Sequence, residues 1–274
     1  MSRHDLAVRL VATDLDGTLL RRDGTISPRT VALLKRINAE GTHVALVTGR
    51  PVRWLSSVYE QLHAPLPSVC ANGAIVYDPI DDRILRTDPL GSDLLGEVCR
   101  KLRAEVPDVT FAVEVSDSRE MRYEKSYPIY PDADPAYVKM VDALDDLCAV
   151  PATKLIARVD GVDSAGFAAT VSRCVAGLVE ATHSSSSAFV EISAAGVTKA
   201  AGLAWLCERL GVRAEQVVAF GDMPNDVPLL SWAGRAVAVA NAHPAVREVA
   251  DDVTLSNEED GVAAYLERLF PEAG

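Results

Sequence analysis

Two aspartates two positions apart follow an apolar stretch near the start of the chain. Asp14 and Asp16 come after residues 6–12, and Gly17 and Thr18 follow them. The apolar run predicts a buried strand, and alternation along a strand places both aspartates on the same side of it. Two carboxylates held close together repel each other unless a cation or a shared proton intervenes. The pair therefore favours a catalytic or metal-binding site, and the ordinary alternative is an Asp-initiated turn after a strand.

Further polar residues follow other predicted strands or begin a predicted helix. In open α/β sheets ligands bind at the carboxyl ends of the strands, so such residues converge on one edge. Taken singly, each has a plain alternative, such as a strand-end turn for Thr48 or a solvated surface position for Lys199. The residues concerned are Thr48, Gly49 and Arg50 after strand 43–47, Asn72 after strand 68–71, Asp222, Asn225 and Asp226 after strand 217–220, and Lys199 in helix 198–210.

The order of predicted elements indicates two parts of different character. Strands alternate with helices over the first 75 residues and again from about residue 190, which predicts a parallel sheet covered on both faces. Short strands and helices without this rhythm lie between the two stretches. We therefore expect an α/β core from residues 1–82 and 191–274, with an α+β insertion at residues 83–190.

Composition limits the classes of function. The 274 residues carry a formal net charge of −12, which argues against a surface for nucleic acid or for anionic membranes. Five scattered cysteines, never in a Cys-x-x-Cys pair, favour free thiols in a reducing cytoplasm. The first residues lack the apolar region of a signal peptide, and no uninterrupted apolar stretch approaches 18 residues. We expect a cytoplasmic enzyme, monomeric or a small homo-oligomer.

Four segments, in this order, resemble the motifs of the haloacid dehalogenase-like (HAD) phosphohydrolases. The forms Thr-Gly-Arg, Asn-Gly and Gly-Asp-Met-x-Asn-Asp are similar to the Cof-type branch with a class IIB cap. The resemblance covers essentially the whole chain, and it implies a Rossmann-like, doubly wound core with the cap inserted between motifs II and III. The four motifs are residues 14–19, residues 48–50, Lys199 and residues 221–226.

The resemblance also implies a role for each motif residue. Asp14 would be the nucleophile that forms an aspartyl-phosphate, and Asp16 would be the general acid and base. Thr48 and Lys199 would bind the transferring phosphoryl group. Mg²⁺ would take an Asp14 oxygen, the Asp16 backbone carbonyl and Asp222, and Asp226 would complete the metal site by holding the waters of the ion. The wider substrate-binding set would be Thr48, Gly49, Arg50, Asn72, Lys199 and Asn225.

These roles predict a Mg²⁺-dependent phosphatase for small phosphate monoesters, such as sugar phosphates or related metabolites. Two alternatives stay open: a phosphomutase or phosphotransferase on the same scaffold, and a non-catalytic protein that binds phosphometabolites. Neither nucleic acid nor a membrane is expected as a partner. Candidates for substrate selection in the cap, chosen by polarity alone, are Arg122, Glu124, Lys154 and His183.

Overall fold

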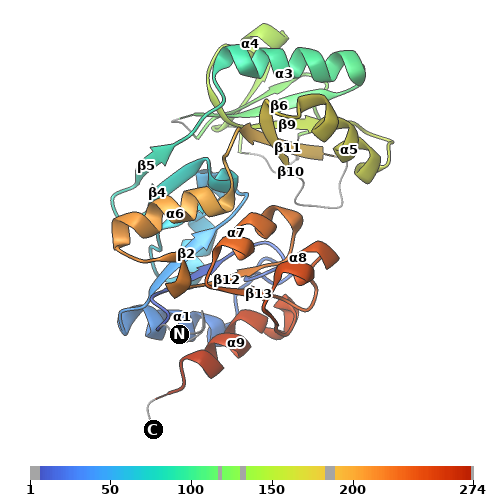
Figure 1. Ribbon diagram of the computed structural model, residues 1–274. Helices are drawn as coiled ribbons and strands as arrows, with labels where there is room; N and C mark the ends of the chain where they lie inside the picture. Colours follow the sequence, from blue (N-terminus) through green and yellow to red (C-terminus); the bar gives the residue numbers. More distant parts are fainter. Residues whose placement is uncertain (1–6, 117–118, 130–133, 183–188, 273–274) are drawn as a thin grey trace. The chain divides into compact units, whose positions relative to one another are not determined.

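The chain divides into two compact units (Figure 1). The computed structural model describes residues 7–116, 119–129, 134–182 and 189–272. One unit, called the core, holds the chain up to Leu85 together with the stretch from Thr198 onward. The other, called the cap, is Arg86–Val197. His183 lies outside the described residues.

The core is built on an eight-stranded sheet with β1 near its middle. Strands β2 and β3 follow β1 on one side of the sheet, and the later strands β12, β13 and β14 lie in that order on the other side of β1. These six strands run parallel, whereas β4 pairs antiparallel with β3. This order confirms the predicted doubly wound sheet, and its switch point lies between β1 and β12. In spatial order the strands are β14 (Asp252–Val253), β13 (Arg235–Ala238), β12 (Val217–Gly221), β1 (Leu10–Thr13), β2 (His43–Val47), β3 (Ser68–Cys70), β4 (Ile75–Asp78) and β5 (Arg83–Thr87).

Helices cover both faces of this sheet. Residues of α6, α7 and α8 form one apolar cluster with the alternate strand residues Leu10, Ala12 and Ala219. Phe220 points to the opposite face, where its ring meets Tyr265 of α9 edge-on at 5.6 Å. The core helices are α1 (Pro28–Ala39), α2 (Ser56–Leu62), α6 (Lys199–Leu210), α7 (Val227–Trp232), α8 (Pro244–Val249) and α9 (Gly261–Leu269), with the 3₁₀ turns η2 (Val52–Trp54), η3 (Ala71–Gly73), η4 (Ala214–Gln216), η5 (Pro224–Asp226) and η6 (Asn257–Glu259).

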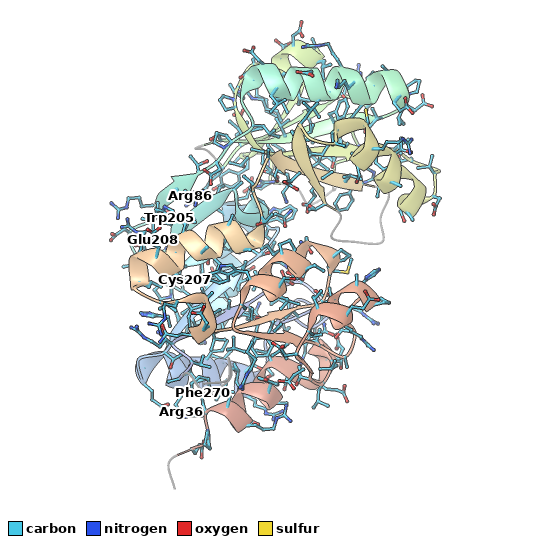
Figure 2. The ribbon with its side chains drawn as sticks, viewed as in Figure 1. Arg36, Arg86, Trp205, Cys207, Glu208 and Phe270 are labelled. Atoms are coloured by element: carbon cyan, nitrogen blue, oxygen red, sulfur yellow. The ribbon has the colours of Figure 1, made fainter. Side chains whose placement is uncertain are left out.

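The helix ends follow from local residue types. Ser27 caps α1 by accepting a hydrogen bond from the Thr30 amide, and Pro28 occupies the first turn. Figure 2 labels Arg36 of α1 and Phe270 just after α9, where Arg36 Nη2 donates to the Phe270 carbonyl at 2.6 Å. This bond ties the C-terminal end of α9 to α1.

The first predicted strand differs at its ends from the observed one, which is Leu10–Thr13. Fully buried Leu55 lies between η2 and α2. Within the described residues, no helix is both long enough and apolar enough to cross a membrane. All five cysteines are free thiols, as the sequence predicted.

The cap is a second sheet with helices on one face. Four of its strand pairs are antiparallel and β7–β8 is parallel, which fits the predicted α+β character. The helices share an apolar cluster with Phe111, Val113 and Leu155. The strands, in spatial order, are β10 (Val179–Thr182), β11 (Phe189–Ala194), β9 (Ala152–Arg158), β6 (Thr110–Val115), β7 (Met121–Glu124) and β8 (Val138–Val141), and the helices are α3 (Ser92–Glu105), α4 (Leu144–Cys148) and α5 (Ser164–Val175).

The cap candidates lie on different faces of this sheet. Arg122 pairs in register with Val113, which lies on the sheet face that packs against the cap helices. Its guanidinium donates to the carbonyl of Asp146 in α4. Glu124 accepts from Arg103 of α3. These contacts give both residues a structural role in holding helices to the sheet. Lys154 lies on the opposite face, where it forms a buried ion pair with Glu191.

Candidate active site

The site lies at the carboxyl ends of three neighbouring strands. Asp14 follows β1, Thr48 follows β2, and Asp222 follows β12. The site therefore occupies the switch point of the doubly wound sheet, which is where ligands bind in open α/β folds.

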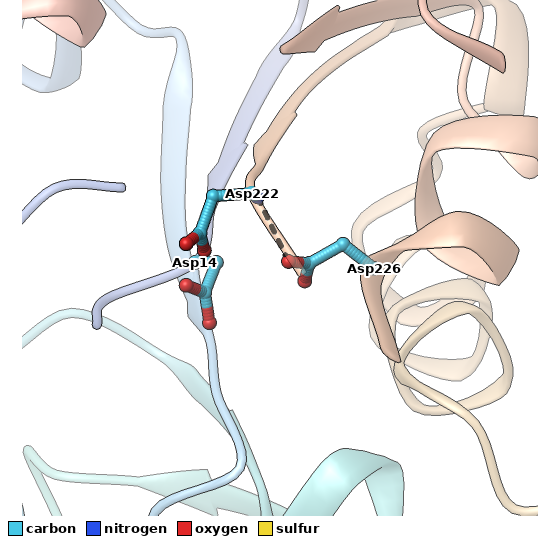
Figure 3. Close-up of side chains that lie close together, drawn as sticks. All are labelled: Asp14, Asp222 and Asp226. Carbon is cyan, nitrogen blue, oxygen red and sulfur yellow. Dashed lines mark hydrogen bonds between the residues drawn. The ribbon is translucent and has the colours of Figure 1, made fainter. Parts of the chain in front are cut away.

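Three carboxylates converge at this point (Figure 3). Asp14, Asp222 and Asp226 are buried, and one carboxylate oxygen of each lies within 4.8 Å of the others. Asp226 is held by its own turn: its Oδ2 accepts from the backbone amides of Asp222, the dashed line in Figure 3, and of Met223, both at 3.0 Å. Residues 14 and 226 thus meet only because β1 and β12 are adjacent strands.

Lys199 supplies the cation of the cluster. Thr198 caps α6 by accepting from the Ala201 amide, which places Lys199 at the first helical position. The Lys199 side chain is 1% exposed, and its Nζ donates to Asp14 Oδ1 and to Asp226 Oδ1, both at 2.6 Å. The surface interpretation of Lys199 is therefore wrong, since the structure buries it among carboxylates.

The electrostatics of the cluster are unbalanced. Burial, with repulsion from Asp226 and Asp222, raises the pKa of Asp14 well above its usual value in spite of Lys199. Burial and then Asp226 raise the pKa of Asp222 to about 7. Burial opposes the Lys199 ammonium, but Asp14 and Asp226 outweigh it and raise its pKa. When all three carboxylates are ionised, the single ammonium leaves two negative charges uncompensated, which is why burial and mutual repulsion raise these pKa values.

These residues fit a divalent cation. The three oxygens are close enough together to share one ion. Hard carboxylate oxygens are the ligands that Mg²⁺ and Ca²⁺ take, and the two uncompensated charges match a dication. The Asp16 side chain is not part of this group of carboxylates.

The Asp16 side chain pairs with Arg50 and not with Lys199. Its carboxylate receives two hydrogen bonds from Arg50, from Nε at 2.8 Å and from Nη2 at 2.6 Å. Thr48 is fully buried, and its hydroxyl accepts from the Arg50 amide at 3.0 Å. Gly49 lies in the same turn. The structure thus joins motif I to motif II through the Asp16–Arg50 pair.

Asn72 and Asn225 form a second link across the site. Asn225 Nδ2 donates to Asn72 Oδ1 at 3.1 Å, and both side chains are buried. Asn225 Oδ1 is buried without a hydrogen-bond partner among the described residues. Asn72 adopts a left-handed φ of 57°. An unpaired buried acceptor beside the carboxylates is available to a ligand.

Two glycines allow these close approaches. Gly17 has φ +80°, and a Cβ there would lie 2.3 Å from Asp222 Oδ2. Gly73 has φ +105°, and a Cβ there would lie 2.0 Å from the carbonyl oxygen of Thr198. The second contact lets the η3 turn pack against the start of α6, and so helps to place Lys199.

Two supporting residues were not assigned roles from sequence. The Thr18 hydroxyl donates to Asp222 Oδ1 at 3.1 Å, and Asn241 Nδ2 donates to the Gly17 carbonyl at 2.7 Å. Asn241 follows strand β13 at the same sheet edge. Its position after an apolar strand was the signal that could have found it.

The family of the chain is shown by its sequence relatives. The haloacid dehalogenase-like hydrolase family matches residues 11–266. The chain belongs to this family. It is 34% identical over 270 residues to the 5-amino-6-(5-phospho-D-ribitylamino)uracil phosphatase YitU of Bacillus subtilis, covering 95% of this chain and 97% of that one. It is 31% identical to a phosphoglycolate phosphatase of Methanopyrus kandleri, covering 96% and 97% of the two chains.

A solved structure supports the fold of this family. The HAD subclass IIB sugar phosphatase BT4131 is 18% identical, with a TM-score of 0.81 over 96% of this chain and 99% of that one. At this identity the similarity concerns the fold alone. The predicted membership of the HAD superfamily is confirmed, and the named relatives confirm the expectation of a phosphoric monoester hydrolase.

Proposed function

We propose that this HAD hydrolase is a Mg²⁺-dependent phosphatase that acts on small phosphate monoesters through an aspartyl-phosphate on Asp14. The observation that carries the proposal is the buried cluster at the switch point, in which Asp14 contacts Lys199 beside Asp222 and Asp226. A cluster of like charges is expensive to bury, which favours a catalytic role over a packing role.

The first step transfers the phosphoryl group to the protein. An Asp14 carboxylate oxygen attacks phosphorus in line with the ester oxygen, and the bond from phosphorus to that oxygen breaks. Asp16 gives a proton to the departing oxygen, which leaves as an alcohol. Lys199 holds Asp14 in place and offsets negative charge on the phosphoryl oxygens.

The second step releases phosphate. Asp16 takes a proton from a water molecule, whose oxygen attacks phosphorus, and the bond from phosphorus to Asp14 breaks. Orthophosphate leaves, and Asp14 is again a carboxylate. A Mg²⁺ ion held by Asp14, Asp222, Asp226 and the Asp16 carbonyl would neutralise charge on the phosphoryl oxygens and orient them.

We assign substrate selection to the cap. The two named relatives act on different small phosphate monoesters, 5-amino-6-(5-phospho-D-ribitylamino)uracil and phosphoglycolate. Both compounds, with a set of sugar phosphates, form the panel on which the chain is first tested. Among the described residues, Lys154, paired with Glu191, is the cap candidate left after Arg122 and Glu124 are assigned to structure. Five free thiols fit a cytoplasmic, reducing environment.

The test of the activity is turnover of 4-nitrophenyl phosphate with release of orthophosphate. Chelation with EDTA is expected to abolish turnover, and added Mg²⁺ is expected to restore it. Full turnover in EDTA contradicts the metal assignment. Phosphoryl transfer to a second substrate molecule in place of orthophosphate release favours a mutase or phosphotransferase. Absence of any turnover across the panel favours a binding protein.

The roles of the two aspartates are tested by leaving groups. Asp14→Asn is expected to form no phosphoenzyme. In Asp16→Asn, an aryl phosphate with a good leaving group still reacts in the first step, while hydrolysis slows by roughly 10²–10⁴-fold. Phosphoenzyme then accumulates with a burst of phenol, which rapid quench and mass spectrometry of the Asp14 peptide detect. A burst in Asp14→Asn contradicts the assignment.

A further inference from the structure

The Arg50 guanidinium donates a hydrogen bond to each oxygen of the Asp16 carboxylate. Nε donates to Oδ2 at 2.8 Å and Nη2 donates to Oδ1 at 2.6 Å, so the two planar groups meet as a two-pronged fork. The Asp16 side chain is 61% exposed and that of Arg50 is 21% exposed. The pair is therefore open to solvent on the Asp16 side, where a competing anion can approach.

The backbone of Arg50 is fixed while its side chain is long. The Arg50 amide donates to Thr48 Oγ1, and its carbonyl accepts from the Ala71 amide, both at 3.0 Å. Thr48 follows β2, and β2 is the neighbour of β1, which Asp14 follows. Arg50 therefore belongs to the same sheet edge as the proposed phosphoryl acceptor.

We propose that Arg50 exchanges partners during the reaction, leaving Asp16 for the phosphoryl group of the substrate when that group binds. The proposal rests on the proposed function, in which Asp16 is the general acid and base. It makes Arg50 a positioning residue that frees Asp16 only when a phosphoryl group is present.

The geometry of the Arg50–Asp16 pair suits such an exchange. The two bonds hold the Asp16 carboxylate in the plane of the fork, so a rotation of this carboxylate toward a leaving group breaks at least one of its bonds to Arg50. A phosphoryl group offers two oxygens at a spacing that matches the same fork, and it carries more charge than a carboxylate. In the proposed exchange, phosphoryl binding to Arg50 and release of Asp16 occur together.

The exchange predicts that Asp16 and phosphate compete for Arg50. The test is a double-mutant cycle with Asp16→Ala and Arg50→Gln, read out as orthophosphate affinity by calorimetry in the presence of Mg²⁺. With Arg50 present, Asp16→Ala is expected to tighten orthophosphate binding about tenfold, the scale of one charged hydrogen bond. In the Arg50→Gln background the same change is expected to alter affinity less than about twofold.

If Asp16 only repelled phosphate through its charge, Asp16→Ala would tighten orthophosphate binding equally with Arg50 and with Arg50→Gln. Equal tightening in both backgrounds, or no tightening in either, overturns the exchange. Arg53→Gln is the matched control, since its guanidinium lies 5.3 Å from the Trp54 ring in the next turn, and the Asp16→Ala effect is expected to persist there. Arg50→Lys keeps the charge without the fork, and it is expected to reduce the effect to below about threefold.

Folding and activity are measured separately. Circular dichroism and thermal unfolding check each variant, and Asp16→Ser replaces Asp16→Ala if the latter does not fold. Turnover of 4-nitrophenyl phosphate by the unmodified chain tests the proposed function. Turnover without coupling between Asp16 and Arg50 supports the phosphatase activity and contradicts the exchange. Coupling without turnover contradicts the proposed function.

Discussion

Replacement of Lys199 by methionine separates the electrostatic role of this residue from its packing role. Methionine keeps most of the side-chain volume and removes the charge. The variant loses two hydrogen bonds of 2.6 Å to buried carboxylates, each worth about 1.5–3 kcal/mol in a charged pair. Breaking a buried ion pair costs about 3–5 kcal/mol, because the remaining charges stay buried without a partner.

Three measurements follow from this loss. The free energy of unfolding in EDTA is expected to fall by about 3 kcal/mol or more. Turnover of 4-nitrophenyl phosphate in saturating Mg²⁺ is expected to fall by about 10²-fold or more, the effect of removing one preorganised charge. Affinity for Mg²⁺ is expected to rise by about tenfold, since the cluster of Asp14, Asp222 and Asp226 becomes more negative.

A control variant distinguishes these effects from general destabilisation. Leu206 is a buried core residue on the same helix, and Leu206→Ala is expected to cost about 2–5 kcal/mol without changing kcat at low temperature. The reasoning is refuted if Lys199→Met keeps turnover within threefold of the parent. It is also refuted if Mg²⁺ affinity falls together with stability, because Lys199 would then act only through packing.

Three further predictions follow from other contacts. Gly17→Ala is expected to lower kcat at least about tenfold in steady-state assays, because its Cβ would strike the Asp222 carboxylate; an unchanged kcat contradicts this. Glu124→Gln weakens the pair with Arg103 and is expected to lower the free energy of unfolding by about 1–3 kcal/mol in urea titrations, whereas no change would make the pair dispensable. Burial raises the pKa of Tyr265 to about 12, so the folded chain keeps a proton that the unfolded chain loses near pH 10. Stability is therefore expected to fall between pH 10 and about 12, and thermal unfolding of Tyr265→Phe should show a smaller fall.

The positions of the motif residues could be predicted from sequence because strand ends in a parallel sheet share one edge. Asp14, Thr48 and Asp222 each follow an apolar run, and the sheet order brings those runs together. The contacts within the site could not be predicted in the same way. Arg50 reaches Asp16 across 34 positions, and its choice of that carboxylate depends on side-chain geometry.

The sequence also could not show on which face of the cap sheet each candidate residue lies. Polarity suggested Arg122 and Lys154 equally, but register decides their surroundings. Arg122 pairs with Val113 and therefore faces the helices, whereas Lys154 pairs with Glu114 on the opposite face. A shift of one residue in either strand would have exchanged these environments.

The adjacency of β1 and β12 has a consequence for how the chain acquires its structure. Thr18 and Asp222, which hydrogen-bond across this junction, are 204 positions apart. During synthesis β1 and its partner β2 leave the ribosome early, but the other edge of β1 has no strand to meet until β12 is made. The whole of Arg86–Val197 is made in that interval. Domains tend to fold as units while the chain grows, and distant pairings form slowly. The cap therefore has time to fold first, and Asp14 meets Lys199 only when the later part of the core packs against β1.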